Sequence, residues 1–431
     1  MRIKDEFTPH AKQLDFAISQ AKFPAFVGGV GSGKTAVGAW KARNLAIINA
    51  GCLGVVGAPT YAQLRDGTMR EFFRWCPDEI IKRKTESTTA GLMVELINGS
   101  KILFRSFDKP ANLRSLTIGW GWYDEAGFGP EEGFRVLLAR IRDKRAKLRQ
   151  LLITTSPNGT RNWLFRKKQE TDKKDPLWAW FRASSRDNPH NPDDYVDALA
   201  GNLSARAAQQ EIDGEFIGAE GLVYGGDFNP GPDGHIVDYT YDPLRPVSIA
   251  LDFGYRKSAL LAFQQRREDE SWVCFDEEMF EDTGTPGIVS ALTQKPYAKR
   301  VVSVVHDPAG LNNAQDTGAP SVQILEQEGF ACEAPDERRI ERGIEAVRFN
   351  LAPYRGRPRL FFARKLQQIE EDRGWSRGVL KDIQAYHYPE KGDTTVPEHD
   401  DSSHSMDALR YWVLQRLPVG GSGGFGSFRR H

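Results

Sequence analysis

No stretch of this sequence is apolar over the length that a membrane span requires. The longest purely apolar runs are a few residues long, as at residues 45–48, whereas a bilayer-spanning helix needs about 20. Residues 1–7 also lack the apolar core of a secretory signal. We therefore expect a cytosolic protein without a transmembrane helix.

Cysteine is scarce, with 4 among 431 residues. Cys52, Cys76, Cys274 and Cys332 lie far apart and form no Cys-x-x-Cys pair. This spacing argues against a disulfide framework and against a structural zinc site, and it is typical of a reducing compartment.

Net charge is absent from the chain as a whole but not from its halves. Residues 1–219 carry 33 Lys and Arg against 25 Asp and Glu, and residues 220–431 carry 25 against 33. A basic half suits a polyanion such as nucleic acid, and an acidic half can supply carboxylates for divalent cations. Two domains with differently charged solvated surfaces are the alternative, and charge counts leave both open.

The first half alternates short apolar segments with segments of helical length. The apolar segments are residues 23–27, 54–58, 101–104, 119–123 and 150–155. Continuous apolar strands separated by helices predict a parallel sheet covered on both faces, and therefore an α/β architecture.

A turn-rich sequence at residues 187–192, followed by a glycine-rich stretch, separates this region from a second set of strands. We expect those strands at residues 247–251, 260–264, 272–275 and 301–305, and a last helix at 402–417. At about 150 residues per domain, the chain has room for two or three domains. The predicted parts are a first domain at 1–186, a lid or linker at 187–245, a second α/β domain at 246–417 and a flexible tail at 418–431.

Residues 28–35 read Gly-Gly-Val-Gly-Ser-Gly-Lys-Thr and match the phosphate-binding pattern GxxxxGK[ST]. The motif follows a predicted strand and opens a predicted helix, where backbone N–H groups and the helix N-terminus can bind phosphates. Lys34 would place its charge against the β- and γ-phosphates of ATP, and Thr35 would offer its hydroxyl to Mg²⁺. The other predicted ATP contacts are Gly28, Gly31, Ser32 and Gly33. A glycine-rich turn without function is the alternative, against which the flanking strand and helix argue.

Asp124 and Glu125 directly follow the apolar segment 119–123, where a nucleotide hydrolase needs carboxylates. Asp124 would hold Mg²⁺, and Glu125 would act as general base for the attacking water. Two acids that merely begin a surface turn are the alternative. Their place behind a phosphate loop favours the catalytic interpretation.

Other polar residues near these motifs suit a nucleotide site. Gln13, just before the first strand, could read the adenine edge with its amide, or could be a surface glutamine. Thr155, in the Thr-Thr-Ser-Pro-Asn-Gly sequence that ends the fifth strand, could sense the γ-phosphate, or could belong to an ordinary turn. Arg105, Arg114 and Arg161 are candidates for the extra cation that stabilises the transition state of hydrolysis, and the sequence does not choose among them.

Acids also follow two apolar strands of the second half. Asp252 follows the strand at 247–251, and Asp307 comes two residues after the strand at 301–305. If these strands are neighbours, the two carboxylates lie together and repel each other unless a cation neutralises them. A capping role for each acid is the alternative. Glu277 and Glu278, near a third strand, are reserve ligands.

A third acidic cluster opens the last helix. On a helix, Asp400, His404 and Asp407 fall near one face by their i, i+4, i+7 spacing. Carboxylates and histidine around one point suit Mg²⁺ or Mn²⁺, and two such ions can activate water and stabilise the leaving oxygen of a phosphodiester. Asp401 is close enough to compete, so the third ligand stays open among Asp401, His404 and Asp407.

The whole series of motifs resembles the large terminase subunit of tailed bacteriophages, the motor that packages DNA into empty capsids. The series consists of the phosphate loop, the Asp-Glu strand end, the Thr-Thr-Ser turn, and the later sequences Leu-Asp-Phe-Gly, His-Asp-Pro-Ala-Gly and Asp-Ala-Leu-Arg-Tyr. The likeness extends from about residue 8 to about residue 415. It implies an N-terminal P-loop ATPase of the ASCE, RecA-like class, a small lid and a C-terminal RNase H-like nuclease.

The resemblance also implies roles for single residues. It makes Lys34 and Thr35 the Walker A pair and Asp124 and Glu125 the Walker B pair. Residues 154–156 correspond to the coupling motif, and Arg114 stands where the family tends to place an arginine finger that acts on a neighbouring subunit. The nuclease acids by this match are Asp252, Asp307 and Asp407, and the extra ligands Asp401 and His404 depart from a simple Asp triad.

We therefore predict an ATP-driven translocase of double-stranded DNA joined to a metal-dependent endonuclease that cuts concatemeric DNA. Residues 140–149 include six basic residues and one acidic residue, which suits sequence-independent phosphate contacts or a solvated helix face. The resemblance further implies a ring of subunits, expected to be a pentamer, on the portal protein of the procapsid in the host cytoplasm, and a small terminase partner. The rival functions are an ATP-dependent helicase or repair enzyme with a fused nuclease, and a non-catalytic, ATP-regulated DNA scaffold.

Overall fold

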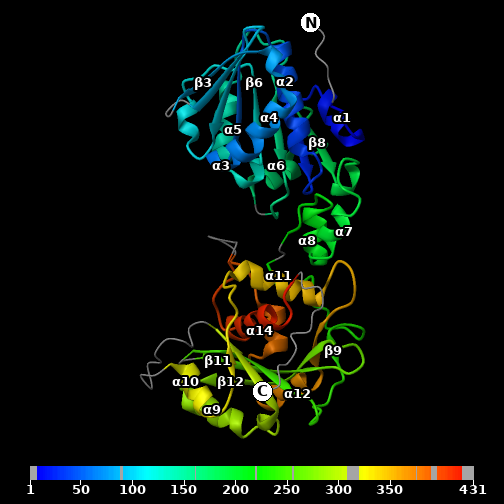
Figure 1. Ribbon diagram of the computed structural model, residues 1–431, viewed down its shortest axis with the longest axis vertical. Coiled ribbons are helices and arrows are strands. Elements are labelled where there is room, and N and C mark those ends of the chain that lie inside the picture. The colour runs from blue at the N-terminus through cyan, green and yellow to red at the C-terminus, as the bar shows by residue number, and fades with distance from the viewer. Residues whose placement is uncertain are drawn as a thin grey trace. The chain divides into compact units, whose positions relative to one another are not determined.

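The computed structural model describes residues 7–87, 91–160, 162–218, 221–254, 257–307, 320–374, 376–389 and 396–419. The chain divides into two compact units, and each contains one large sheet (Figure 1). The first unit is Met1–Ala198 with Ala207–Gly218, and the second is Leu199–Arg206 with Ala219–His431. Among the described residues, no helix combines the length and apolarity that crossing a membrane requires.

The first unit contains an eight-stranded sheet in the order β3-β4-β5-β2-β6-β7-β1-β8. Its strands are β1 (Phe23–Gly28), β2 (Leu53–Ala58), β3 (Ile81–Ser87), β4 (Gly91–Leu96), β5 (Lys101–Ser106), β6 (Trp120–Asp124), β7 (Leu151–Thr155) and β8 (Trp178–Ala183). All pairs from β5 to β8 are parallel, and only β3 and β4 add antiparallel pairs at one edge. The predicted parallel sheet is therefore confirmed. Strands β3, β4 and β8 were not predicted from the sequence. The edge strand β3 is polar, whereas β4 and β8 contain the short apolar stretches 92–94 and 178–181, which were not assigned to strands.

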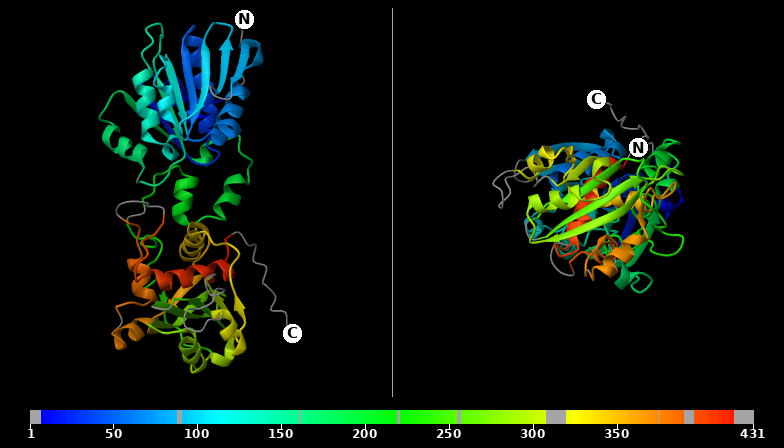
Figure 2. Two further views of the ribbon diagram at one scale, coloured as in Figure 1. Left: turned by 90° about the vertical axis from the view of Figure 1, so that its left-hand side faces the viewer. Right: turned by 90° about the horizontal axis from the view of Figure 1, so that it is seen from below.

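Helices lie on both sides of this sheet (Figures 1 and 2). They are α1 (Ala11–Ile18), α2 (Lys34–Ile48), α3 (Tyr61–Gln63), α4 (Arg70–Trp75), α5 (Glu131–Arg140) and α6 (Trp163–Thr171). Two further short helices, α7 (Tyr195–Ala200) and α8 (Ala205–Glu211), follow β8, and each belongs partly to both units. Alternate residues of the strands enter two separate cores, because successive side chains of a strand point to opposite faces. Phe26 and Trp122 pack with α2 and α4, whereas Ala25 and Tyr123 pack with α5 and α6. The central strands are thus buried on both faces, as their continuous apolar sequences predict.

The second unit contains a seven-stranded sheet in the order β14-β13-β10-β11-β12-β15-β9. Its strands are β9 (Ile236–Val237), β10 (Val247–Asp252), β11 (Lys257–Gln265), β12 (Trp272–Glu281), β13 (Val301–His306), β14 (Cys332–Glu333) and β15 (Leu360–Ala363). Only β11 runs against its neighbours, and every other pair is parallel. The strand order places β10 in the interior of the sheet, between β11 and β13.

Helices cover both faces of the second sheet as well. They are α9 (Thr285–Thr293), α10 (Ser321–Gln327), α11 (Ile340–Leu351), α12 (Lys365–Asp372), α13 (Val379–Ala385) and α14 (Ser403–Arg416). Ile249 and Leu251 of β10 pack on the side of α9 and α10, whereas Ala250 packs on the side of α11 and α14. Helix α14 is mostly buried, and its Trp412 stacks on Phe263 of β11 with ring centroids 3.8 Å apart. This stack fixes the helix that carries the third acidic cluster over the centre of the sheet.

The stretch 187–245, predicted as a lid or linker, is divided between the two units. Residues 187–198 and 207–218 belong to the first unit, and residues 199–206 and 219–245 to the second. Asn188 donates from its Nδ2 to the carbonyl of Gly31 over 2.7 Å. The turn-rich sequence that suggested a boundary is therefore part of the first unit, and a lid function remains a prediction. The predicted tail falls almost wholly on residues 420–431, outside the described residues.

The basic run 140–149 is an irregular loop, so the helix-face alternative is wrong. Helix α5 ends at Arg140, and the loop then leads into the start of β7. Because β7 is parallel to β1, this loop lies at the opposite edge of the sheet from the phosphate loop, which follows the end of β1. The side chains of Arg142, Lys144, Arg145, Lys147 and Arg149 are exposed.

We predict that Gly54→Ala destabilises the first unit. A Cβ at Gly54 of β2 would lie 2.1 Å from the ring of Trp120 on the paired strand β6, and that ring is fully buried. Such overpacking typically costs ~1–3 kcal/mol, and urea denaturation followed by tryptophan fluorescence measures it. Gly67→Ala is the matched control, because nothing lies within 4 Å of its added Cβ. Equal stability of Gly54→Ala and the unaltered protein would contradict the close approach of β2 and β6.

Candidate functional site

The phosphate loop connects β1 to α2 and is held in one shape by backbone contacts. Gly31 and Gly33 have φ of 74° and 77°, a region that side-chain-bearing residues rarely adopt. A Cβ at Gly33 would also lie 2.3 Å from Nε2 of Gln13. Ser32 is fully buried, and its hydroxyl has no hydrogen-bond partner among the described residues. A buried hydroxyl without a partner, two residues before Lys34, is consistent with a loop whose donors bind phosphate oxygens.

Gln13 lies against this loop. Its Nε2 donates to the carbonyl of Gly33 over 2.9 Å, and its Oε1 accepts from the backbone N–H of His10 over 3.1 Å. The amide thus positions the loop, so the surface-glutamine alternative is wrong, while recognition of adenine stays a prediction. Gln13 also lines a cavity of about 580 Å³ together with Lys34 and Thr35, and that size falls within the range of small-molecule sites.

Asp124 ends β6 inside a network of hydroxyl groups. Its Oδ1 accepts from Thr154 over 2.6 Å, and Thr154 accepts from the indole N–H of Trp122 over 2.7 Å. Its Oδ2 accepts from Thr68 over 2.8 Å, and the hydroxyl of Thr35 lies 3.5 Å from Oδ1. Burial, together with the neighbouring Glu125 charge, raises the pKa of Asp124 to about 6, and the two threonine hydroxyls oppose this rise. The phosphate loop and the Asp124 strand end therefore meet at one point, as predicted.

Glu125 contacts both the phosphate loop and the turn after β7. Its Oε1 lies 3.4 Å from Nζ of Lys34, and its Oε2 accepts from the backbone N–H of Ser156 over 2.9 Å. The backbone of Glu125 has a φ of 49°, a conformation that is uncommon for this residue type and concentrates at functional sites. Glu125 lines a second cavity of about 370 Å³ with Thr35 and Asp124.

The remaining predicted nucleotide residues lie apart from this centre. The hydroxyl of Thr155 accepts from the N–H of Gly127 and donates to the carbonyl of Ser156, so contact with a γ-phosphate stays a prediction. Arg114 is exposed and forms an ion pair of 2.8 Å with Glu132. Arg105 is the last residue but one of β5 and is partly buried, and Arg161 lies outside the described residues.

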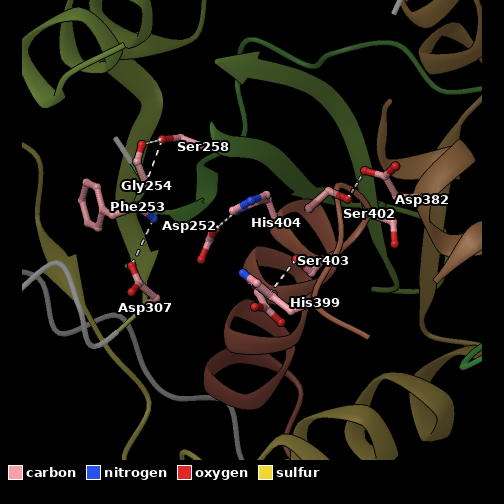
Figure 3. A network of polar contacts seen from close by, with 12 residues as sticks. Asp252, Phe253, Gly254, Ser258, Asp307, Asp382, His399, Ser402, Ser403 and His404 are labelled. Atoms are coloured by element: carbon pink, nitrogen blue, oxygen red, sulfur yellow. Dashed lines mark hydrogen bonds and ion pairs between the residues drawn. The ribbon is translucent and has the colours of Figure 1, made fainter. Parts of the chain in front are cut away.

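Asp252 and Asp307 lie side by side in the second unit, as strand adjacency predicts. Leu251 of β10 pairs with His306 of β13 in parallel register, so the next residue of each strand is an acid. Oδ1 of Asp307 accepts from the backbone N–H of Phe253 over 3.1 Å. Figure 3 shows the two acids on neighbouring strand ends. Burial, followed by the charges of Asp407 and Asp307, raises the pKa of Asp252 to about 7, and the hydrogen bond from His404 opposes this rise.

Helix α14 brings His404 to Asp252. Nδ1 of His404 lies 2.9 Å from Oδ2 of Asp252, and the two side chains point toward each other from the helix and the strand (Figure 3). Asp407 lies one turn further along and is paired with the buried Arg410 over 2.6 Å. Asp401 forms an ion pair with Lys257, and its side chain is 65% exposed. Of the three alternatives for a third ligand, His404 contacts Asp252 directly, the charge of Asp407 is near enough to act on Asp252, and Asp401 pairs with Lys257 instead.

Glu277 and Glu278 lie away from this group, because β11 separates β12 from β10. Oε2 of Glu277 accepts from the N–H of Val379 over 2.7 Å, and burial raises the pKa of Glu277 well above its usual range. Glu278 is paired with Lys295 and Arg373. Their proposed role as reserve ligands is therefore wrong.

The donor set around Asp252 is carboxylate oxygen and imidazole nitrogen, which suits Mg²⁺ or Mn²⁺. The described residues nevertheless include no group of three or more His, Cys, Asp or Glu side chains already close enough to enclose an ion. Asp252 and His404 contact each other directly, so the side chains would have to rearrange to admit a metal. The residue types therefore suit a divalent cation, but in this arrangement the candidate ligands Asp252 and His404 are hydrogen-bonded to each other.

Sequence reasoning missed several residues that shape these centres. Thr68 lies in a π-helical turn, Leu64–Met69, far from any motif, and Asn188 lies in what was taken for a linker. Neither residue has a signal in its own neighbourhood, because each contact is created only when distant segments pack together.

Known proteins share both the sequence and the fold of this chain. Residues 20–206 match the family model of the phage terminase large subunit. The PBSX phage terminase large subunit of Bacillus subtilis (strain 168) is 31% identical over 165 residues, which are 38% of this chain and 37% of that protein. The large terminase of the thermophilic bacteriophage D6E superposes with a TM-score of 0.52 at 16% identity and covers 95% of this chain and 100% of its own. The D6E protein in complex with ADP gives a TM-score of 0.50 with the same coverage of this chain.

These matches agree with the geometry. The aligned sequence contains the phosphate loop, the Asp124–Glu125 strand end and the turn after β7, and the D6E fold extends over both units. Residues 20–206 of the chain are thus similar to the phage terminase large subunit family, and the chain as a whole shares the fold of a large terminase.

Proposed function

We propose that this chain is a viral DNA-packaging motor: its first unit hydrolyses ATP to drive double-stranded DNA into a procapsid, and its second unit cuts concatemeric DNA. The observation that carries this proposal is the presence of two separate buried acid sites in one chain. One is built on a phosphate loop, and the other is built on the ends of β10 and β13. The likeness of residues 20–206 to the terminase family and the D6E complex with ADP support the nucleotide.

ATP would bind with its phosphates over the loop 28–35. Lys34 would then exchange its contact with Glu125 for the β- and γ-phosphates, which leaves Glu125 free to accept a proton from the attacking water. Ser156 would hold Glu125 by its backbone N–H during this step. Mg²⁺ would be held by Thr35 and Asp124 and would neutralise charge on the phosphates.

The turn after β7 is in position to connect hydrolysis to movement. Thr154 contacts Asp124, and Ser156 contacts Glu125. Both acids of the site are therefore hydrogen-bonded to the same short segment, residues 154–156. Loss of the γ-phosphate would change the charge balance at Lys34 and Glu125, and that change would reach residues 154–156 directly. Arg114 is exposed, as a residue that completes a neighbouring subunit's site should be.

The second unit would cleave DNA at Asp252 and Asp307. These two carboxylates would hold Mg²⁺ or Mn²⁺, with two ions as the expected number, and the metal would supply the activated water and stabilise the leaving oxygen. His404 orients Asp252 through its 2.9 Å contact, and Asp407 is held in place by Arg410. The third metal ligand would be either His404 or Asp407.

The proposed partners follow from the family. They are double-stranded DNA, a portal protein, a small terminase subunit and further copies of this chain in a ring, expected to be a pentamer, on a procapsid in the host cytoplasm. The exposed basic loop 141–149 supports contact with DNA phosphates. A helicase with two RecA-like domains is disfavoured, because the middle strand of the second sheet, β11, runs against both of its neighbours, so this is not a second parallel nucleotide-binding sheet.

We predict that Lys34→Ala and Glu125→Gln each reduce ATP turnover by at least about a hundredfold. The first removes the cation on the phosphates, and the second removes the general base, whose contribution is typically ~10²–10⁴. Phosphate release, measured with DNA present, tests this. Asp252→Ala is the control and should keep normal turnover. Unchanged turnover in Lys34→Ala would overturn the nucleotide site.

We predict that Asp252→Ala and Asp307→Ala abolish plasmid cleavage with Mn²⁺ or Mg²⁺. Loss of a ligand removes several kcal/mol of transition-state stabilisation, so the rate should fall at least about a hundredfold. Gel analysis of supercoiled plasmid measures the cleavage. Lys34→Ala should cleave normally, and Asp401→Ala should retain most activity because Asp401 pairs with Lys257. If cleavage persists in Asp252→Ala, the site lies elsewhere.

A further inference from the structure

A segment that carries no recognised motif forms one wall of the ATP hydrolysis site. After β2 the chain passes through a capping box, in which Thr60 and Gln63 exchange hydrogen bonds, and then through the π-helical turn Leu64–Met69. Gln63, Gly67 and Thr68 line the cavity of about 370 Å³ that also contains Asp124 and Glu125. Isolated π-helical turns occur frequently at functional sites.

Thr68 is the member of this wall that touches a catalytic acid. Its side chain is 1% exposed, and its hydroxyl donates to Oδ2 of Asp124 over 2.8 Å. The other carboxylate oxygen, Oδ1, accepts from Thr154 over 2.6 Å. The carboxylate is therefore held by one hydroxyl on each oxygen, and these two donors come from opposite sides in the sequence.

The two hydroxyls have different supports. Thr154 belongs to β7, next to β6 in the sheet, and its own oxygen accepts from Trp122. Thr68 belongs to a separate segment that packs against β2 and β5 through its π-helical turn. Thr154 thus holds Asp124 from a neighbouring strand of the same sheet, whereas Thr68 holds it from a helical turn that packs against the sheet.

A buried carboxylate without Thr68 would lose this outer restraint. Asp124 is 2% exposed, and removal of one donor leaves a buried charged oxygen unpaired, which is costly. The side chain could then turn away from Thr35, whose hydroxyl lies 3.5 Å from Oδ1. Groups that orient a metal ligand in this way commonly contribute ~10–100-fold to metal affinity.

We propose that Thr68 is a positioning residue that orients Asp124 toward the Mg²⁺ of bound nucleotide. This inference rests on the proposed ATPase function. The hydroxyl of Thr68 is buried and donates to Asp124, so binding of nucleotide without divalent cation should not depend on it. Its contribution is confined to the step in which Mg²⁺ joins the nucleotide in the site.

The test compares Thr68→Val, which has nearly the same shape but no hydroxyl, with Thr68→Ser, which keeps the hydroxyl. A fluorescent ADP analogue is titrated into the full-length protein in EDTA and at increasing Mg²⁺, and the Mg²⁺ concentration for half-maximal ATP turnover is measured in parallel. Thr68→Val should need ~10–100-fold more Mg²⁺ in both assays and should bind the analogue normally in EDTA. Thr68→Ser should stay within about threefold of the unaltered protein.

Two further variants separate this effect from a folding defect. Thr171→Val removes another buried hydroxyl, which donates to the carbonyl of Lys167 away from the site, and should leave the Mg²⁺ dependence unchanged. Thr68→Ala lacks the hydroxyl in a smaller side chain and should reproduce the Mg²⁺ effect if Thr68→Val folds poorly. An unchanged Mg²⁺ dependence in Thr68→Val or Thr68→Ala overturns the role of Thr68. Absence of Mg²⁺-dependent nucleotide binding in the unaltered protein overturns the ATPase function itself.

Discussion

Carboxylates buried at the ends of central strands are the constraint on which both units depend. Asp124 ends β6, and Asp252 ends β10. Each is almost entirely buried, and burial raises the pKa of Asp124 to about 6 and that of Asp252 to about 7. A charge in such a place is unfavourable unless donors or cations surround it. Each unit surrounds its buried carboxylate with a different set of hydrogen-bond donors.

In the first unit the donors are hydroxyl groups, a backbone N–H and the Lys34 ammonium group. Thr154 and Thr68 hold Asp124, and Ser156 and Lys34 hold Glu125. These contacts join the phosphate loop, the turn after β7 and the π-helical turn into one polar network. A change of charge beside Lys34 and Glu125 would therefore act on several elements at once, as the proposed motor function requires.

In the second unit the donor is an imidazole carried by a long helix. Trp412 stacks on Phe263 and donates from its indole to Ser248 of β10, so the position of α14 over the sheet is fixed by its buried face. His404, on the same helix, then meets Asp252. The site thus depends on the packing of α14 as much as on the acids, since the helix supplies both His404 and Asp407.

Some expectations from sequence were incomplete for a common reason. The edge strand β3 is polar and has no continuous apolar run, so no strand was expected there. Residues 187–192 look like a linker, yet Asn188 holds the phosphate loop. Glu277 and Glu278 lie in a strand near Asp252 in sequence, but β11 separates them from it. In each case the deciding interaction joins segments distant in the chain.

The sequence by itself determined the local chemistry, namely the glycines and lysine of the phosphate loop and the acids that follow apolar strands. It also indicated that Asp252 and Asp307 lie together, provided that the strands before them are neighbours. These follow from short-range rules, because a strand, a tight turn and a helix start are each specified by a few neighbouring residues. The tertiary structure alone decided which side chains hold those acids. Thr68 reaches Asp124 across 56 positions and His404 reaches Asp252 across 152, and only the packing of helices on a sheet of fixed strand order brings such residues within hydrogen-bond distance.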